Sequence, residues 1–481
     1  MNNIHTRPDT QSAPVSLKKA QDYYKALLRP VFAGRKFLLA GEVAVGLGNQ
    51  SRGLAGLGAA RPFLLADSEG TGRIPTPAEA ELHVLDIRGV DILDQHHQSE
   101  AALQHLTPEV QAAVEAWDPE GEARWLCSIM LSEIATIAGR RKYASRELSW
   151  TQLEDKIAID EFWDNTGVIR APSRIVPVER AALTSAVTAM DRGMGTVWAA
   201  DTRKGINGGG VGLRWVRAGD DGSAAIRFFR NFAHRVRVMP FLEGIPVSIH
   251  GVVFPDFVAV FRPVEMVVLR QSNSDRFIYA GCSNWFDPRQ EDREVMRLIA
   301  RRVGAALRER VGYRGAFTVD GVLAEEGFLP TELNPRIGGG IKTLAKGLGD
   351  FPLTPLCWAV TEGEPLDYRP SLFERIVLAS ADTYRAGGGW ATTSTQFSEN
   401  AGFNLVHENG EYQEAPSNQK THAVLTYGPG PRGGFLSFEL DTDLNQTGTP
   451  VAPEVVRALR FADRRLGTNF GCLEAAKNVR P

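Results

Sequence analysis

Short apolar runs separated by polar, glycine-containing stretches recur along the first 140 residues. Residues 36–40, 62–66 and 83–87 are compact apolar segments of strand length, without the alternation expected of a half-exposed strand. Such runs are typical of parallel strands that are buried on both faces. The pattern therefore predicts an α/β domain with a Rossmann-like parallel sheet, in which residues 41–58 form a glycine-rich loop after the first strand.

Alternation of apolar and polar residues marks residues 317–323 and again residues 328–334. It predicts two antiparallel strands joined by a short turn. Because side chains two apart share one face of a strand, Glu332 and Asn334 point the same way, and a partner strand can bring Asp320 beside them. Two carboxylates and an amide oxygen form a hard oxygen site of the kind that Mg²⁺ takes together with substrate phosphates. The alternative is a surface hairpin with ordinary polar residues.

The region between these two patterns contains further predicted elements. Thr151 and Glu154 have the spacing of a capping box, which predicts that a helix begins there. Lys156 lies on one side of this helix, and its apolar face consists of Leu153, Ile157 and Phe162. Strands are predicted at residues 173–177 and 197–201.

An amphipathic helix is predicted over residues 293–313. Its apolar stripe consists of Val295, Leu298, Ile299, Val303, Leu307 and Val311. Beyond residue 350 the pattern predicts strands at 373–379 and 423–427, glycine-rich turns at 387–389 and 428–434, and a final helix at 453–467. We identify no group of catalytic residues in this last part of the chain.

Composition is that of a large soluble protein. The 481 residues suffice for two to three domains, because a single core stops growing at about 250–300 residues. The apolar content of 43%, the charged content of 23% and the net charge of −3 give no electrostatic reason to expect nucleic acid or an anionic membrane as partner. The four cysteines are far apart and form no C-x-x-C pair, so free thiols in a reducing compartment are expected. Residues 1–16 lack the apolar segment of a signal peptide and no run is long enough to span a bilayer, which predicts a disordered tail on a cytoplasmic protein.

Two segments have an alternative interpretation. Residues 41–58 could be a dinucleotide-binding loop, but they lack a clean G-x-G-x-x-G, and Asp67 is only a loose match to the ribose-binding acid, so packing of a structural loop is favoured. The cluster around Asp91, His96 and His97 could bind a metal. Adjacent histidines point apart in any regular element, which favours a solvated face.

The segment with Asp320, Glu332, Asn334, Arg336 and three following glycines resembles the metal-binding end of the ATP-grasp superfamily. Members typically carry an acidic residue on one strand and E-x-N-x-R followed by glycines on the next. The resemblance implies that the two acids and the asparagine hold Mg²⁺, or Mn²⁺, against the phosphates of ATP. It also implies that Arg336 is catalytic and steadies the transferring phosphoryl group or an acyl phosphate, which is the charge neutralisation that phosphoryl transfer requires.

Two further segments resemble the superfamily's phosphate-binding parts. A helix with Lys156, followed by the turn GVIRAP at residues 167–172, implies that this lysine reaches the α-phosphate of ATP. The flap over the triphosphate, whose glycines expose backbone N–H groups, would consist of Lys204, Asn207, Gly208, Gly209 and Gly210. One departure is that the preceding strand ends in Ala200 and Asp201, where the superfamily has V-K-P; Lys204 is a candidate to replace that lysine.

The stretch 237–250 resembles the hinge between the two halves of the grasp. The resemblance implies that Glu243 binds the ribose hydroxyls, and the residues along the adenine edge would be Met239, Phe241 and Leu242. Downstream, Arg262 is a second catalytic candidate, because a strand-borne arginine suits a carboxylate substrate. The alternative is a structural pair between Arg262 and Glu265.

Together the resemblances predict an α/β (α+β grasp) protein of four parts: a disordered tail (1–16), a pre-ATP-grasp domain (17–139), an ATP-grasp domain (140–349) and a small C-terminal α/β domain (350–481). This layout, with the sequences GINGGG, PFLEGIPVSIHG and TELNPRIGGG, resembles the ATP-grasp peptide ligase of pheganomycin biosynthesis and its relatives.

The resemblance implies an ATP-dependent carboxylate–amine ligase of natural-product biosynthesis. It would join amino acids, or an amino acid and a peptide, through an acyl phosphate, and release ADP and phosphate. Its partners would be small-molecule carboxylates and amines, and a homodimer is compatible with the layout. Two alternatives stay open: an ATP-grasp enzyme with another acceptor, as in carboxylases, and a nucleotide-binding module that has lost turnover.

Overall fold

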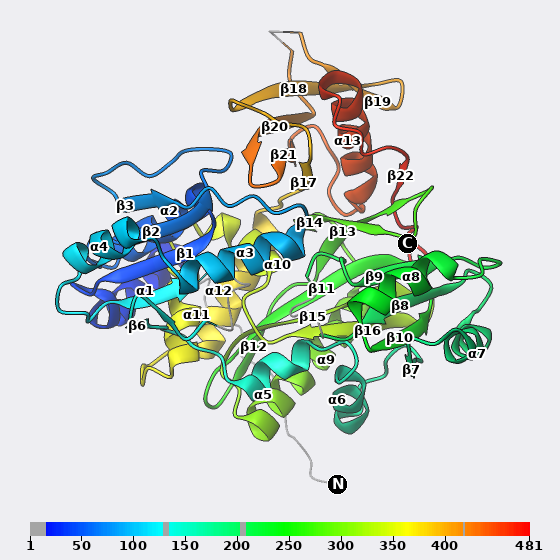
Figure 1. Ribbon diagram of the computed structural model, residues 1–481, viewed down its shortest axis with the longest axis horizontal. Helices are drawn as coiled ribbons and strands as arrows, with labels where there is room; N and C mark the ends of the chain where they lie inside the picture. The colour runs from blue at the N-terminus through cyan, green and yellow to red at the C-terminus, as the bar shows by residue number, and fades with distance from the viewer. Residues whose placement is uncertain (1–15, 128–133, 203–207, 417–418) are drawn as a thin grey trace.

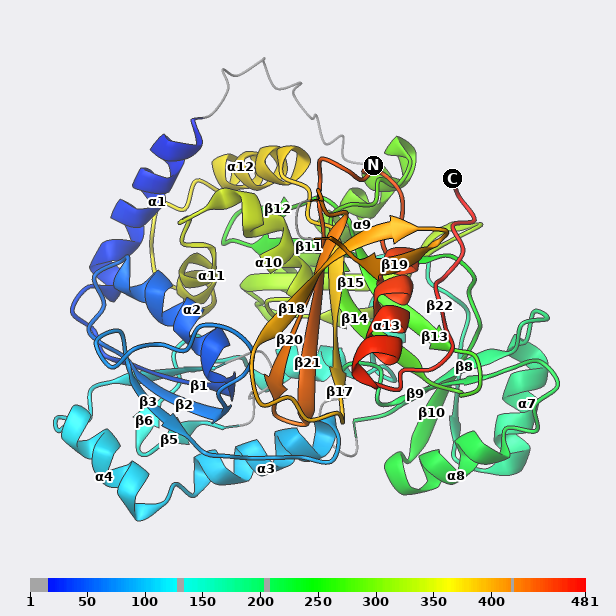
Figure 2. The same cartoon turned by 90° about the horizontal axis from the view of Figure 1, so that it is seen from above.

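The computed structural model describes residues 16–127, 134–202, 208–416 and 419–481. All of the predicted tail except Ser16 therefore lies outside the described residues. Within these ranges the chain forms four sheets and one short two-stranded hairpin, with helices packed around them (Figures 1 and 2). The predicted α/β class is confirmed.

The N-terminal sheet is parallel throughout, in the order β3-β2-β1-β4. Its strands are β1 (Phe37–Val43), β2 (Phe63–Ser68), β3 (Glu81–Val84) and β4 (Arg124–Cys127), and its helices are α1 (Leu17–Phe32), α2 (Ala44–Ala55), α3 (Ile92–Gln104) and α4 (Pro108–Trp117). The hairpin of β5 (Thr136–Ile137) and β6 (Arg140–Arg141) follows. The strands predicted at 36–40 and 62–66 are confirmed, and the first five residues of both β1 and β2 are buried. The strand predicted at 83–87 is shifted, since β3 ends at Val84 and has no buried residue.

Helix α2 corrects the prediction of a glycine-rich loop after the first strand. The buried face of this helix, at helical spacing, consists of Ala44, Leu47, Ser51 and Leu54. Burial of this face outweighs the helix-weakening effect of three glycines. Gly48 is required by packing, because a Cβ atom there would lie 2.5 Å from the Cγ atom of Pro75.

A small antiparallel sheet follows, in the order β7-β10-β8-β9. Its strands are β7 (Arg174–Pro177), β8 (Thr196–Ala200), β9 (Leu213–Val216) and β10 (Arg235–Pro240), flanked by α7 (Arg180–Met190) and α8 (Ser223–Phe232). Before it come α5 (Leu148–Thr151), the 3₁₀ turn η1 (Gln152–Glu154) and α6 (Ile159–Thr166). The predicted capping box is wrong, because Asp155 is extended and interrupts the helix, and Glu154 binds arginine side chains instead of a backbone N–H.

The central sheet has the path β14-β13-β11-β15-β16, with β12 on β11 and β22 on β13. Its strands are β11 (Ile245–Val253), β12 (Val258–Val260), β13 (Val264–Gln271), β14 (Phe277–Ser283), β15 (Gly315–Ala324), β16 (Gly327–Asn334) and β22 (Leu473–Glu474). Helix α9 (Gln290–Val311) covers one face and confirms the predicted amphipathic helix. Its predicted stripe is partly wrong: Val295 and Leu298 are 48% and 60% exposed, and Met296 and Ala300 are buried in their place.

A helical layer of α10 (Gly339–Ala345), η2 (Lys346–Leu348), α11 (Leu353–Glu362) and α12 (Pro370–Thr383) follows the central sheet. The strand predicted at 373–379 is wrong, because this run belongs to α12 and buries Phe373, Ile376 and Val377 at helical spacing. A short apolar run alone does not distinguish a strand from a buried helix. The layer shares one hydrophobic core with α1 and β1, so it joins the N-terminal sheet to the central sheet.

The C-terminal sheet is antiparallel, in the order β17-β21-β20-β18-β19. Its elements are β17 (Gly388–Thr393), β18 (Ala401–Glu408), β19 (Glu411–Glu414), β20 (Ala423–Gly430), β21 (Gly433–Leu440) and the covering helix α13 (Ala452–Leu466). The strand predicted at 423–427 and the helix at 453–467 are confirmed. The glycine turns are corrected, since residues 388 and 389 belong to β17 and the turn after β20 consists only of residues 431 and 432.

Across the described ranges, no helix has the length and apolarity needed to cross a membrane.

Candidate functional site

One cavity of about 620 Å³ lies between the N-terminal, small and central sheets. Its walls come from the end of β1 and the first turns of α2, from β8 and β10, from the strands of the central sheet, and from α10. Of the thirteen predicted site residues that the structure describes, eleven line this one cavity. Those that line it are Lys156, Gly208, Gly209, Gly210, Met239, Phe241, Leu242, Asp320, Glu332, Asn334 and Arg336.

A β-bulge determines which side chains of the β15–β16 hairpin share a face. Near the turn, Leu323 pairs with Phe328, a register that would place Asp320 opposite Thr331. The register shifts by one residue beyond Gly321, so that Asp320 pairs with Glu332. Because directly paired residues of antiparallel strands lie on the same face, the bulge brings Glu332 onto the face of Asp320.

The bulge is held by a buried arginine from the small sheet. Arg237 on β10 donates from its Nη1 atom to the Thr331 carbonyl at 2.9 Å, and its other nitrogens contact the carboxylate of Asp160 at 2.6 and 3.1 Å. Its side chain is buried and nevertheless borders the cavity. Arg237 therefore ties the small sheet to the central sheet beside Glu332. Sequence analysis missed this residue, because nothing in the alternation of β10 distinguishes a bridging arginine from a solvated one.

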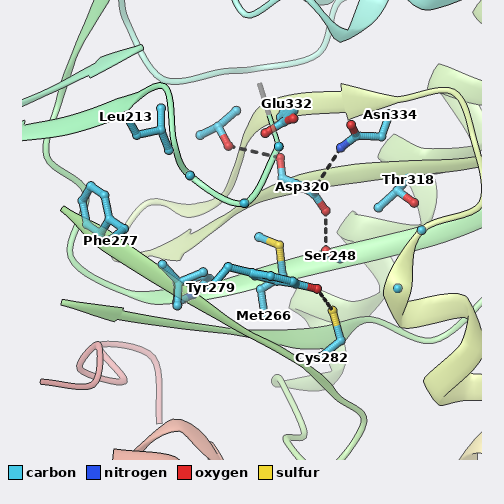
Figure 3. A pocket seen from close by; sticks show the side chains of 18 of the residues that line it. Leu213, Ser248, Met266, Phe277, Tyr279, Cys282, Thr318, Asp320, Glu332 and Asn334 are labelled. Atoms are coloured by element: carbon cyan, nitrogen blue, oxygen red, sulfur yellow. Dashed lines mark hydrogen bonds between the residues drawn. The ribbon is translucent and has the colours of Figure 1, made fainter. Parts of the chain in front are cut away.

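Three strands contribute polar groups around Asp320 (Figure 3). Ser248 on β11 donates to one carboxylate oxygen, and the Asn334 Nδ2 atom donates to the other at 2.8 Å. Burial and, secondarily, the neighbouring Glu332 carboxylate raise the pKa of Asp320 to about 7, against the lowering effects of Ser248, Arg336 and Lys156. A divalent cation bound by two carboxylates on one face removes the repulsion between them.

This donor set fits Mg²⁺. Asp320 and Glu332 supply carboxylate oxygens and Asn334 an amide oxygen, which are the hard ligands that Mg²⁺ takes, usually completed by phosphates and water. In the part of the chain that the structure describes, no group of three or more His, Cys, Asp and Glu side chains is arranged to hold a metal. The cluster around Asp91 and His96 is accordingly not a metal site: Asp91 caps α3, and His96 lies beside Glu100.

Cationic side chains border the same carboxylates. The Nζ atom of Lys156 lies 2.9 Å from Glu332, and this lysine is buried in the turn between η1 and α6. Arg336 contacts Glu154 at 3.1 Å through Nε and donates to the Asn334 amide oxygen at 2.9 Å. Burial alone lowers the pKa of Arg336, but the Glu154 carboxylate outweighs it, so the guanidinium stays charged. Both predicted phosphate-contacting cations are thus held in place by acidic partners.

The glycines of the predicted flap border the cavity without being crowded. Gly209 and Gly210 have φ values of +60° and +78°, while a Cβ atom at either would meet no atom closer than 3.5 Å. Backbone conformation, and not space, therefore requires glycine at these two positions. The nearest neighbour of Gly209 is Ile92 at the start of α3, so the flap reaches the N-terminal domain. Lys204 and Asn207 lie outside the described residues.

At the predicted adenine edge, Met239, Phe241 and Leu242 line the cavity. Phe241 stacks on Trp215, with ring centroids 4.1 Å apart. The guanidinium carbon of Arg270 lies over the Phe241 ring, 4.8 Å from its centroid.

Glu243 does not line the cavity and has other partners. Its carboxylate binds Arg270 at 2.6 and 2.9 Å and accepts the N–H of Lys477 at 3.0 Å. Burial would raise the pKa of Glu243, but these contacts lower it, so Glu243 is ionised and fixes Arg270. The predicted ribose contact of Glu243 is therefore replaced, in this structure, by a role in holding the wall of the pocket.

Arg262 lies away from the cavity, which corrects its prediction as a catalytic residue. Its guanidinium contacts Asp382 at 2.5 Å and also pairs with Asp287. The alternative pair with Glu265 is not formed either, because Glu265 accepts backbone N–H groups of Val451 and Ala452. Arg262 thus connects the central sheet to α12.

Two buried side chains of the cavity are chemically inactive at neutral pH. Burial lowers the pKa of His250 to about 3, and the ring shares a hydrogen bond of 2.8 Å with Thr318. Burial also raises the pKa of the Cys282 thiol to about 12. Neither a protonated imidazole nor a thiolate is therefore available. The glycines after Arg336 serve packing here, since a Cβ atom on Gly340 would lie 2.1 Å from the His250 ring.

Comparison with known proteins agrees with this geometry. Residues 204–340 match the ATP-grasp domain family. The chain therefore contains an ATP-grasp domain over these residues. The matched residues of this ATP-grasp protein include the flap, the hinge and all strands from β11 to β16, and thus Asp320, Glu332 and Asn334.

Several solved structures resemble the ATP-grasp protein. Pyruvate carboxylase from Rhizobium etli gives a TM-score of 0.50 at 14% identity, over 93% of this chain and 40% of that chain. Phosphoribosylamine–glycine ligase from Thermotoga maritima gives 0.48 at 14% identity, over 92% and 97%. N5-carboxyaminoimidazole synthase from Aspergillus clavatus gives 0.47 at 12% identity, over 90% and 100%. Likeness at these identities concerns the fold alone. No curated protein sequence matches this chain.

Proposed function

We propose that this ATP-grasp protein is an ATP-dependent carboxylate–amine ligase that works through an acyl phosphate. One observation carries the proposal: the bulged β15–β16 hairpin gathers Asp320, Glu332 and Asn334 on one face of a single cavity, beside Arg336 and Lys156. The arrangement supplies what γ-phosphoryl transfer needs, namely oxygen ligands for a metal and guanidinium and ammonium groups for the phosphates.

Each part of the cavity has a proposed role in holding ATP. Mg²⁺ held by the two acids and the asparagine would neutralise charge on the phosphates. Lys156 would bind the α-phosphate and the flap glycines would cover the triphosphate. The wall at Met239, Phe241 and Leu242 would receive adenine, with the Trp215 stack behind it.

The proposed chemistry has two steps. A substrate carboxylate oxygen attacks the γ-phosphorus of ATP, an O–P bond forms, the bond to the β–γ bridging oxygen breaks, and ADP leaves. Arg336 then offsets charge on the acyl phosphate. In the second step an amine nitrogen attacks the acyl carbon, the bond from carbon to the phosphate oxygen breaks, and phosphate leaves as the amine gives up a proton. His250 does not take this proton, since it is too weak a base.

The finer assignment is part of the same proposal. We infer that the substrates are amino acids or short peptides, and that the product is an amide of the kind that pheganomycin-type ligases form. The flap, hinge and metal-end sequences resemble those ligases. The proposal also includes domain boundaries at residues 139/140 and 349/350, a cytoplasmic location and a homodimeric state.

The test is a product analysis. The purified chain is incubated with ATP, Mg²⁺ and a matrix of amino acids and dipeptides, and nucleotides and amides are identified by chromatography and mass. Release of ADP and phosphate, with formation of a hydroxamate when hydroxylamine replaces the amine, is expected. AMP and pyrophosphate would overturn the mechanism, ADP release that needs bicarbonate would favour a carboxylase-type acceptor, and ATP binding without any turnover would favour a binding module.

A further inference from the structure

Two oppositely charged side chains face the cavity without any role in the proposed binding of ATP. Lys342 lies on α10 and Glu42 lies near the end of β1, and both line the cavity. Lys342 is exposed there and Glu42 is half-buried. These two elements belong to different layers of the fold: α10 is part of the helical layer and β1 is part of the N-terminal sheet (Figure 2).

Neither charge is neutralised by the protein. Within the described ranges, neither the ammonium of Lys342 nor the carboxylate of Glu42 takes part in a hydrogen bond or ion pair that the structure records, and they do not pair with each other. The other cations of the cavity differ: Lys156, Arg336 and Arg270 each contact a carboxylate. Lys342 as a residue is exposed to the cavity, but the protein around its ammonium group lowers its pKa, and no counter-ion opposes this effect. An uncompensated charge of this kind is a marker of ligand binding.

A third polar group comes from α2, the helix that follows β1. Gln50, one and a half turns into α2, lines the same cavity, and its buried Oε1 atom accepts no hydrogen bond. A buried amide oxygen without a donor costs stability unless a ligand supplies one. The N-terminal side of the cavity therefore presents two oxygen acceptors, and the α10 side presents one cation.

We propose that Lys342 and Glu42, with Gln50, form the binding site of a zwitterionic amine substrate, an amino acid or short peptide. Lys342 binds the free carboxylate of this substrate, and Glu42 and the Gln50 amide oxygen accept hydrogen bonds from its ammonium group before the amine reacts. The inference rests on the proposed ligase function and adds the residues that recognise the amine substrate, together with the requirement that this substrate carries a free carboxylate. The carboxylate at Lys342 is not the one that becomes activated, so this molecule is the acceptor and a different carboxylate is the donor.

The test compares substrates that differ only in charge. Wild-type chain, Lys342→Met, Glu42→Gln and the control Lys346→Met are assayed for ADP release with ATP, the best amino acid of the twenty standard ones, and the amide of that amino acid. Lys346 is a suitable control because it lies one turn further along and already pairs with Glu439 at 3.0 Å on the surface. Binding of ATP by each variant is measured separately by calorimetry.

The expected result is that Lys342→Met raises the KM for the amino acid by about 10- to 100-fold and abolishes the preference for the acid over its amide, with the affinity for ATP unchanged within about twofold. Glu42→Gln raises the same KM and leaves the acid–amide preference intact, and Lys346→Met matches wild type.

Three outcomes overturn the inference. The first is a loss of ATP affinity in Lys342→Met with an unchanged KM for the amino acid, which would make Lys342 a phosphate ligand. The others are equal use of the acid and its amide by wild type, and turnover with amines that lack a carboxylate but with no free amino acid. Failure of the proposed function itself is recognised separately, by the absence of ADP formation with every amine.

Discussion

Glu332 lies directly across from Asp320 only because Thr331 is an extra residue in β16. We expect Glu332→Ala to reduce kcat by about 100-fold or more, which corresponds to about 3 kcal/mol of lost transition-state stabilisation, while the melting temperature changes little. ADP release at increasing Mg²⁺ is the measurement, and Glu326→Ala, an exposed acid at the turn of the same hairpin, is the control. Wild-type activity of Glu332→Ala at every Mg²⁺ concentration, limiting ones included, would mean that Glu332 is not a metal ligand.

The Nζ atom of Lys156 lies 2.9 Å from the Glu332 carboxylate, and in the proposed ATP site this lysine also binds the α-phosphate. Lys156→Met should raise the KM for ATP by about tenfold or more, because a buried charge-assisted contact to phosphate is lost. Titration with ATP, followed by calorimetry, measures the effect against Lys420→Met, which removes an exposed lysine. Equal ATP affinity in both variants would restrict Lys156 to its structural pair with Glu332.

The flap provides a test of backbone conformation. Gly209→Ala and Gly210→Ala each force an L-residue to a positive φ, at a cost of about 1 kcal/mol, so the flap should close less readily and the KM for ATP should rise or kcat should fall. Gly53→Ala in α2 is the opposite case, since a helical glycine with free space around it should accept alanine with a gain in stability. Unchanged kinetics in the flap double variant would assign these glycines to a turn without function.

Removing the guanidinium that Glu243 holds should weaken the proposed adenine wall. Arg270→Met removes both the ion pair and the contact over the Phe241 ring, and we expect the KM for ATP to rise by about 3- to 10-fold. Arg276→Met, on the hairpin connection between β13 and β14, serves as the control. If the two variants bind ATP equally well, the stack has no part in nucleotide binding.

Glu265 makes stability depend on pH. Burial raises its pKa from 4.5 to about 7, against the lowering effect of the N–H groups of Val451 and Ala452. Between these two values the unfolded chain is ionised while the folded chain retains the proton, so the free energy of unfolding falls as the pH rises from about 4.5 to about 7 and is constant above. Glu265→Gln should flatten this part of the profile in urea titrations at several pH values. A profile as steep as that of wild type would show that other groups cause it.

The site was predictable to the extent that side-chain alternation determines it. Period-two spacing puts Glu332 and Asn334 on one face without knowledge of the rest of the sheet. The bulge at Thr331, the Ser248 contact from a strand 70 residues earlier and the Arg237 tie depend on tertiary pairing, and no local pattern reports them.

The errors in the fold prediction have the same origin. Residues 44–55 and 373–379 form helices because buried neighbours receive one face of each, which outweighs glycine content in α2 and a strand-like composition in α12. Arg262 was a reasonable candidate by residue type, but Asp287 and Asp382 approach it from segments that are remote in sequence. The sequence indicated the chemistry of the site where the motif is local. It did not indicate where a side chain such as that of Arg262 lies in the fold.

Strand β22 pairs with β13 after the chain has traversed the whole C-terminal sheet and α13 (Figure 1). That sheet is thus an insertion between two strands of the central sheet, fastened at its entrance and at its exit. A body joined at two points can rotate about the line between them but cannot swing freely, as one on a single linker does. The exit leads directly to Lys477, whose N–H contacts the Glu243 carboxylate, so the end of this insertion is attached to the wall of the cavity.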